Sequence, residues 1–90
     1  MALLFDKRTS NGPSTARAWR GGIGTFAVWG SFGGGTLKLQ MSPDGGVTWI
    51  DLGPEAHFTA TSVAQFGLGV CLIRAELSGS DGNASVSCSI

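Results

Sequence analysis

The side chains that could do acid–base or nucleophilic chemistry are one histidine, two cysteines and six carboxylates. His57 is the only one of them whose ordinary pKa lies near neutral pH. No pattern in the sequence joins His57 to a nucleophile and to a carboxylate that would orient it. We therefore interpret His57 as an ordinary residue at a strand edge, and we expect the protein not to be an enzyme.

Metal and cofactor sites are equally unsupported by the residue pattern. The chain has no Cys-x-x-Cys pair and a single histidine, so we predict no metal site. The three glycines at 33–35 lack the lysine and the following helix of a phosphate-binding loop. We predict that the protein carries no cofactor.

The two cysteines are expected to be free. If Asp81 and Gly82 formed a two-residue hairpin turn, Cys88 would face Ala75 and Cys71 would face no residue. This spacing disfavours a disulfide across the strands. Two buried thiols that act as small apolar side chains are the expectation.

A β-hairpin is predicted around the turn residues 43–46. Residues 36–41 and 48–52 both alternate between apolar and polar side chains, which is typical of strands on either side of a tight turn. A four-residue loop would place Ser42 opposite Val47, Leu39 opposite Ile50, and Leu37 opposite Leu52. The aliphatic side chains would then share one face, and the other would carry Lys38, Gln40, Trp49 and Asp51.

Residues 42–49 read Ser-x-Asp-x-Gly-x-Thr-Trp, which resembles the Asp-box of sialidase-type β-propellers. The resemblance implies that Asp44 caps backbone N–H groups, that glycine adopts a positive φ, and that Trp49 packs across the hairpin. The motif occurs once in a chain too short for a propeller. We therefore expect it to be structural rather than sugar-binding.

Composition indicates one small all-β domain. The chain has 90 residues and fifteen glycines, and no window repeats apolar residues at helical spacing. Six or seven short strands predict a small antiparallel β-sandwich or barrel over residues 19–90. In residues 24–32, Phe26 and Val28 should face the core and Trp29 the opposite side. In residues 84–90, the apolar residues should face inward and the three serines outward.

Only 13% of the residues are charged, while 42% are hydrophobic. This balance predicts that copies of the chain or a larger partner cover part of its surface. No apolar run is long enough to span a membrane. Residues 1–5 lack the features of a secretory signal, so we expect folding in a cytoplasm.

Residues 1–18 are predicted to form an extended N-terminal arm. It begins with Leu3, Leu4 and Phe5, which would bury nothing unless they docked on a partner, and then becomes polar. Residues 1–20 contain four basic side chains and one carboxylate, a net charge of +3 that the rest of the chain balances. Such a segment suits an acidic protein surface; nucleic acid is not expected, because no aromatic residues are interleaved.

The stretches Gly24-Thr25-Phe26, 33–36, 39–53 and 72–75, followed by a Ser/Gly-rich end, resemble a group of short β-rich proteins of tailed bacteriophages. The resemblance implies a structural virion protein, in particular a capsid decoration (cement) protein. Such a protein binds major capsid protein subunits at the capsid surface, often as a homotrimer, and is made in the host cytoplasm.

Under this hypothesis the partner-binding residues are the arm tip, the basic residues and two tryptophans: Leu3, Leu4, Phe5, Lys7, Arg8, Arg17, Arg20, Trp29 and Trp49. Tryptophans on an outer sheet face are good anchors for a partner, although they would equally suit a second packing layer. Two other functions stay open. One is a tail or head–tail junction protein, and the other is a carbohydrate- or receptor-binding module with an exposed tryptophan.

Overall fold

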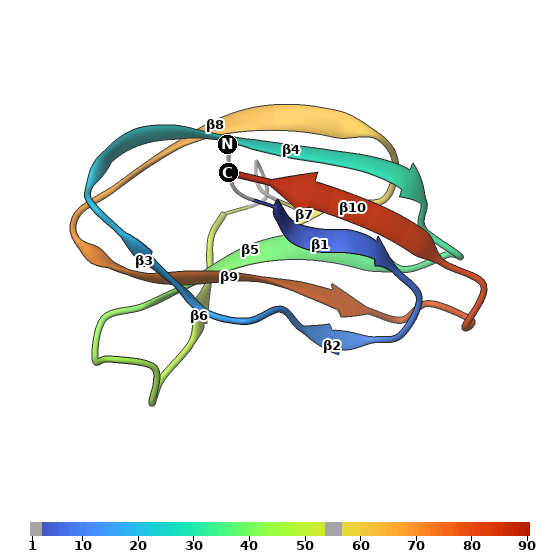
Figure 1. Ribbon diagram of the computed structural model, residues 1–90, viewed down its shortest axis with the longest axis horizontal. Helices are drawn as coiled ribbons and strands as arrows, with labels where there is room; N and C mark the ends of the chain where they lie inside the picture. Colours follow the sequence, from blue (N-terminus) through green and yellow to red (C-terminus); the bar gives the residue numbers. More distant parts are fainter. Residues whose placement is uncertain (1–2, 54–56) are drawn as a thin grey trace.

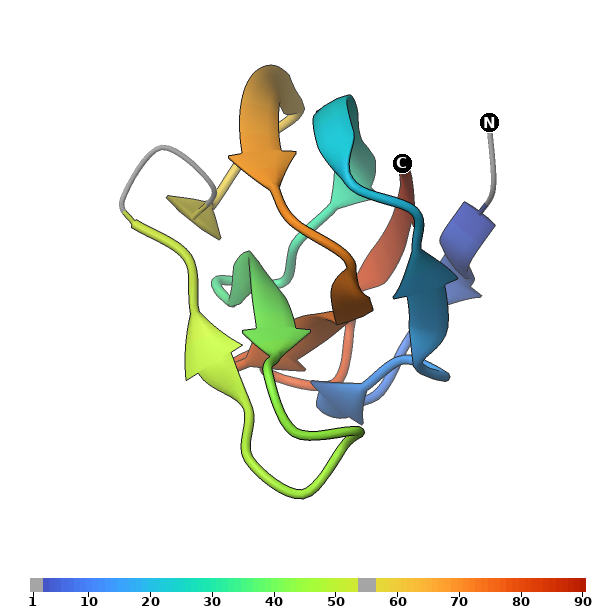
Figure 2. The same cartoon turned by 90° about the vertical axis from the view of Figure 1, so that its left-hand side faces the viewer.

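Two antiparallel sheets pack face to face in the computed structural model, which describes residues 3–53 and 57–90. Sheet A runs in the order β1 (Leu3–Arg8), β10 (Ser85–Ser89), β4 (Gly22–Ser31), β8 (Ser62–Leu68). In sheet B, β9 (Cys71–Ser78) lies beside β5 (Thr36–Ser42) (Figure 1). Four short strands complete its edges: β2 (Gly12–Pro13) and β3 (Arg17–Trp19) pair with β9, and β6 (Ile50–Asp51) and β7 (His57–Phe58) pair with β5. Figure 2, which looks along the strands, shows the two layers. The predicted all-β sandwich is confirmed.

The core lies between the sheets and is built from alternate residues of the long strands. In β4 the even positions face inward, so Phe26 and Val28 are buried as predicted while Trp29 is exposed. Leu37, Leu39, Ile73 and Leu77 project from sheet B and are fully buried. Among the described residues, no helix is long and apolar enough to cross a membrane.

The chain changes sheet at most of its connections. β3, β4 and β5 lie in sheets B, A and B, and β8, β9 and β10 lie in sheets A, B and A. The turn at Asp81 and Gly82 therefore does not close a hairpin, and the pairing of Cys88 with Ala75 is wrong. Cys88 pairs with Val28 and Phe5, whereas Ala75 pairs with Leu39. Alternation in the sequence shows which side of a strand is buried. It does not show to which sheet the strand belongs, because both sheets bury the same kind of side chain.

The register of the Asp-box hairpin differs from the prediction by two residues. β5 pairs with β6 through Gln40 opposite Asp51 and Met41 opposite Ile50, so the loop is longer than four residues. A shift of two leaves each side chain on its predicted face. Leu37 of β5, which was predicted to pair with Leu52, pairs instead with Phe58 of β7.

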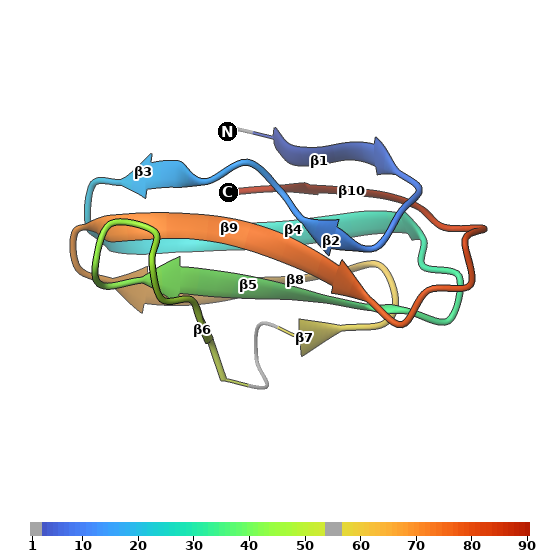
Figure 3. The same cartoon turned by 90° about the horizontal axis from the view of Figure 1, so that it is seen from below.

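The extended arm is not what the structure shows. β1 pairs with β10 at the edge of sheet A (Figure 3), and Phe5 is 3% exposed within the core. β2 and β3 pair with β9 in sheet B, and the Ser14 N–H donates to the Ala75 carbonyl at 2.7 Å. The pairing of β1 contains two register shifts, and Lys7 has a positive φ of 55°. These irregularities break the period-2 pattern from which a strand is recognised.

Candidate interaction surface

The Asp-box loop holds itself together through Asp44 and Ser42. Oδ1 of Asp44 accepts hydrogen bonds from the Val47 and Thr48 backbone amides at 3.2 and 2.8 Å, and from the Ser42 hydroxyl at 2.9 Å. The Ser42 hydroxyl in turn accepts from the Gly46 amide at 2.8 Å. Gly45 and Gly46 have φ values of 79° and 104°. Two features implied by the Asp-box resemblance, the cap by Asp44 and the positive φ of glycine, are confirmed.

These hydrogen bonds favour the ionised form of the Asp44 carboxyl. The Thr48 amide and hydroxyl, followed by Ser42 and Val47, hold the pKa of Asp44 below its ordinary value, with desolvation opposing them. The ionised carboxylate of Asp44 acts as the cap of this loop through Oδ1.

The outer face of sheet B carries a ladder of paired polar side chains. Nε of Arg74 donates to Oε1 of Gln40 at 2.8 Å, and the Gln40 amide donates to Oδ1 of Asp51 at 2.7 Å. Lys38 lies 3.4 Å from Asp51 and 3.7 Å from Glu76. The hydrogen bond from Gln40, and then the charge of Lys38, lower the pKa of Asp51 against a desolvation that raises it. The hydrogen-bonding and charged groups of this ladder are therefore paired with one another.

Trp49 belongs to the same ladder rather than to a free stacking platform. The Arg74 guanidinium lies 4.2 Å from the centre of its ring, and its indole N–H donates to the Gly46 carbonyl at 3.1 Å. One face of the ring is thus covered by a cation. Of the two tryptophans predicted to bind a partner, Trp49 is half-buried and Trp29 is 41% exposed.

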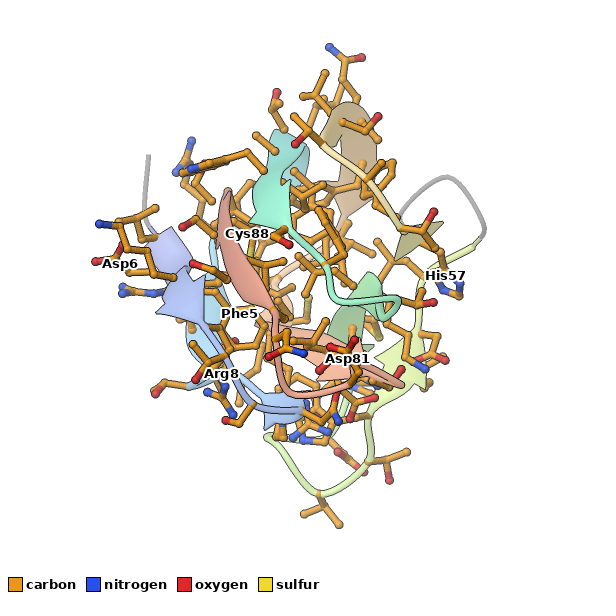
Figure 4. All side chains as sticks on the ribbon, turned by 90° about the vertical axis from the view of Figure 1, so that its right-hand side faces the viewer. Phe5, Asp6, Arg8, His57, Asp81 and Cys88 are labelled. Carbon is orange, nitrogen blue, oxygen red and sulfur yellow. The ribbon has the colours of Figure 1, made fainter. Side chains whose placement is uncertain are left out.

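His57 and the two cysteines do not form a constellation. His57 lies in β7 beside Lys38, on the side of the molecule away from Cys88 (Figure 4). Both thiols are free, as predicted. Cys88 is fully buried, and burial raises its pKa to about 12. Cys71 is only half-buried, and burial raises its pKa as well. Among residues 3–53 and 57–90, no three His, Cys, Asp or Glu side chains are placed to hold a metal ion.

The predicted partner-binding residues near the N-terminus contact the protein's own chain. Phe5 is in the core and is not available to a partner, whereas Leu4 is partly buried against the core. The guanidinium of Arg8 lies 4.9 Å from the Phe5 ring centre, and that of Arg20 lies 5.5 Å from the Trp19 ring centre.

Three other predicted residues lie at the surface near β1. Arg17 donates to the Leu3 carbonyl at 3.2 Å, and the Lys7 amide donates to the Ser87 hydroxyl at 3.0 Å. Leu3 is 46% exposed. These residues line the edge of β1 instead of extending from the body.

The outer face that β4, β8 and β10 form in sheet A has a different character. β4, β8 and β10 contain no charged residue on either face. Three large apolar side chains on this outer face are exposed: Ile23 at 77%, Val63 at 60% and Trp29 at 41%. The positions around them carry only uncharged residues, among them Thr25, Ala27, Gln65 and Ser85. We call this surface the uncharged face.

Sequence reasoning found Trp29 but missed Ile23 and Val63. The absence of charge from the segments 22–31, 62–68 and 85–89 was a usable signal, although nothing in the sequence placed these segments side by side. Ser87 and Ser89 were expected to point outward to solvent, but they are 5% and 4% exposed. β1 and β4 flank β10 on both sides and shield these short side chains.

Comparison of the chain with protein-family models, curated proteins and solved structures finds no match. The arrangement of side chains therefore carries the functional argument. It offers one face whose polar groups are mutually paired and one that is uncharged and partly apolar. Such a division suits association with another macromolecule.

Proposed function

We propose that the protein is a structural virion component, a capsid decoration protein that binds major capsid protein subunits and catalyses no reaction. The uncharged face carries this proposal. It exposes Trp29, Ile23 and Val63 without a charge among its strands, whereas sheet B is lined with ion pairs. Large apolar side chains free of competing charges are the usual centre of a protein–protein contact.

This proposal changes the contact surface that the sequence suggested. The arm tip is not free to reach a neighbouring subunit, because β1 pairs with β10. A two-layer sandwich that seats the uncharged face on the capsid and turns the ion pairs of sheet B to solvent would stabilise the lattice without an arm. Binding should therefore depend weakly on salt, because no charged side chain lies on β4, β8 or β10.

The test is cosedimentation with heads of the virion that carries the protein, prepared without it. Ile23→Lys adds a charge to the uncharged face at a position that is 77% exposed, so folding is unaffected. Binding to heads should fall about tenfold or more, since the lysine must be desolvated in the contact. Val47→Lys is the matched control, because Val47 is 84% exposed on the Asp-box loop.

Equal binding of Ile23→Lys and the unmodified protein would remove the uncharged face from the mechanism. Binding of the unmodified protein to isolated tails, and not to heads, would assign it to the tail or the head–tail junction. Binding to neither would overturn the virion role.

A further inference from the structure

β8 is a sheet edge without the usual protection against pairing. The other edge of sheet A, β1, carries Asp6, Lys7 and Arg8 and has two register shifts. The edge strands of sheet B are short, with two or three residues each, and include Pro13 and Arg17. Short length, charge, proline and irregular register are the devices that keep edges from pairing with another chain.

β8 has none of these devices. It runs for seven residues, Ser-Val-Ala-Gln-Phe-Gly-Leu, with neither charge nor proline. Its register with β4 is continuous from Ser62 to Leu68. No other strand of the described chain pairs with its outer edge, which forms the upper border of sheet A in Figure 1. Such a strand presents a row of unpaired backbone N–H and C=O groups.

We propose that β8 pairs antiparallel with β8 of a second copy of this chain, about a twofold axis through Gln65. Antiparallel pairing around this residue places Val63 opposite Gly67 of the second copy, Ala64 opposite Phe66, and Ser62 opposite Leu68. Apart from Gln65, which faces its own copy, a larger side chain meets a smaller one at each of these pairs. The odd-numbered residues of both copies stay on the uncharged face, as a twofold contact requires.

Gly67 supports a second copy as the occupant. A Cβ atom at this position would meet nothing within 4 Å, and φ of Gly67 is not in the positive region. The fold of a single chain therefore gives no reason for glycine here. Glycine within a strand often marks the close approach of another chain. In the proposed pair that space takes Val63 of the second copy, a side chain 60% exposed in the single chain.

The pair joins two sheets A into one continuous sheet with a single uncharged face. This inference concerns the isolated chain in solution and does not rest on the virion role. It also differs from the homotrimer that the phage resemblance implies, since a twofold contact through one edge strand closes at two copies.

Mass in solution gives the first test, by light scattering or sedimentation over a range of concentrations. The unmodified chain should reach twice its 9.2 kDa mass. Gln65→Lys places like charges face to face at the axis and should weaken the dimer about fivefold or more. Gln65→Glu should do the same, and an equimolar mixture of the two variants should recover a dimer. Ser85→Lys, on the same face but in β10, should leave the dimer intact.

Cross-linking gives a second test that reads the register directly. Gln65→Cys should form a disulfide-linked dimer under mild oxidation, because facing Cα atoms in antiparallel strands lie about 4.5–5.5 Å apart. Val63→Cys alone should not, because its two copies would lie roughly 14 Å apart along the strands. A mixture of Val63→Cys and Gly67→Cys should cross-link.

A chain that stays monomeric at all concentrations, or that forms a trimer, overturns the proposal. So does a dimer that is unaffected by Gln65→Lys, or equal cross-linking by Val63→Cys alone and Gln65→Cys.

Discussion

At the scale of single residues, Asp44 determines the shape of the turn between β5 and β6 in sheet B. Its carboxylate replaces the ladder hydrogen bonds that a tighter hairpin would make, by accepting from the Val47 and Thr48 amides. This is the physical reason for the two-residue difference in register. In the predicted four-residue loop, the Val47 and Thr48 amides would have had to find hydrogen-bond acceptors at Ser42 and its neighbours.

Replacing Asp44 should therefore loosen the loop without unfolding the protein. Asp44→Ala removes all three acceptor contacts and should lower the melting temperature, whereas Asp44→Asn keeps an acceptor oxygen and should lower it less. Thermal unfolding at pH 7 measures both. Identical melting temperatures for Asp44→Ala and the unmodified protein would show that the cap contributes nothing.

Gly30 is the second residue whose identity the fold requires. Its φ is 118°, and a Cβ atom there would overlap the carbonyl oxygen of Ser85 in the neighbouring strand. Gly34 is a matched control, with a φ of 78° and open space around its Cα.

Gly34→Ala should cost about 1–2 kcal/mol from the backbone conformation alone. Gly30→Ala should cost clearly more, because β4 and β10 must also separate. Urea unfolding of the two variants measures the difference. Equal losses would mean that the contact with Ser85 relaxes freely.

At the scale of elements, β1 is the strand whose role changed most between sequence and structure. It supplies Phe5 to the core and covers one edge of β10. The removal of residues 1–18 should therefore disrupt the β body, contrary to what a separate arm predicts.

A point substitution tests this role more cleanly than a deletion. Phe5→Ala should lower the free energy of unfolding by about 3–5 kcal/mol, because it empties a core site. Leu3→Ala, in the same strand but 46% exposed, should cost about 1 kcal/mol or less. Denaturant unfolding at neutral pH compares them. A Phe5→Ala variant as stable as Leu3→Ala would support the predicted extended arm and contradict the role of β1 in the core.

At the scale of the whole molecule, charge is unevenly distributed, and the charged side chains of sheet A are confined to its edge strand β1, which carries Asp6, Lys7 and Arg8. Lys38, Asp51, Arg74 and Glu76 lie on the strands of sheet B, and β4, β8 and β10 of sheet A have no charge at all. The zero net charge of the chain hides this division. It is the feature on which both the proposed capsid contact and the proposed pairing of β8 depend.

Stability should be greatest over a plateau between about pH 4 and 9, limited by different groups at each end. Asp44 and Asp51 have folded pKa values below 3.8, so their contribution is present above about pH 4 and is lost as the pH falls through the folded pKa. Both are exposed, and the acid loss should be gradual.

Both cysteines contribute to the alkaline limit, Cys88 more strongly, because burial raises its pKa from 9.0 to about 12 in the folded state. The unfolded chain releases the Cys88 proton first, so this thiol should lower stability by at most about 1.4 kcal/mol per pH unit above pH 9. Urea midpoints at pH 7, 9 and 10 for the unmodified protein and Cys88→Val measure it. An equally steep fall in both would assign the alkaline limit to another group.

Local sequence determined the parts of this protein that depend on neighbours along the chain. The Asp-box turn closes within eight residues, so its cap and its positive-φ glycines could be read from residue types. The inward faces of β4, β5 and β10 followed from alternation, because burial on one side of a strand leaves a period of two. The free thiols followed from spacing, although through a hairpin that does not exist.

Tertiary structure alone decided which strands are neighbours. The strands that contain Val28 and Val86 alternate between inward apolar and outward side chains in the same way as the strands that contain Leu39 and Ile73. The first two strands nevertheless lie in sheet A and the other two in sheet B. The incorporation of β1 was equally hidden, because its register shifts erase the alternation that would have marked it. The uncharged face exists only because β8, β4 and β10, which are far apart in the sequence, are brought together by long-range hydrogen bonding, and local propensity carries no information about such pairing.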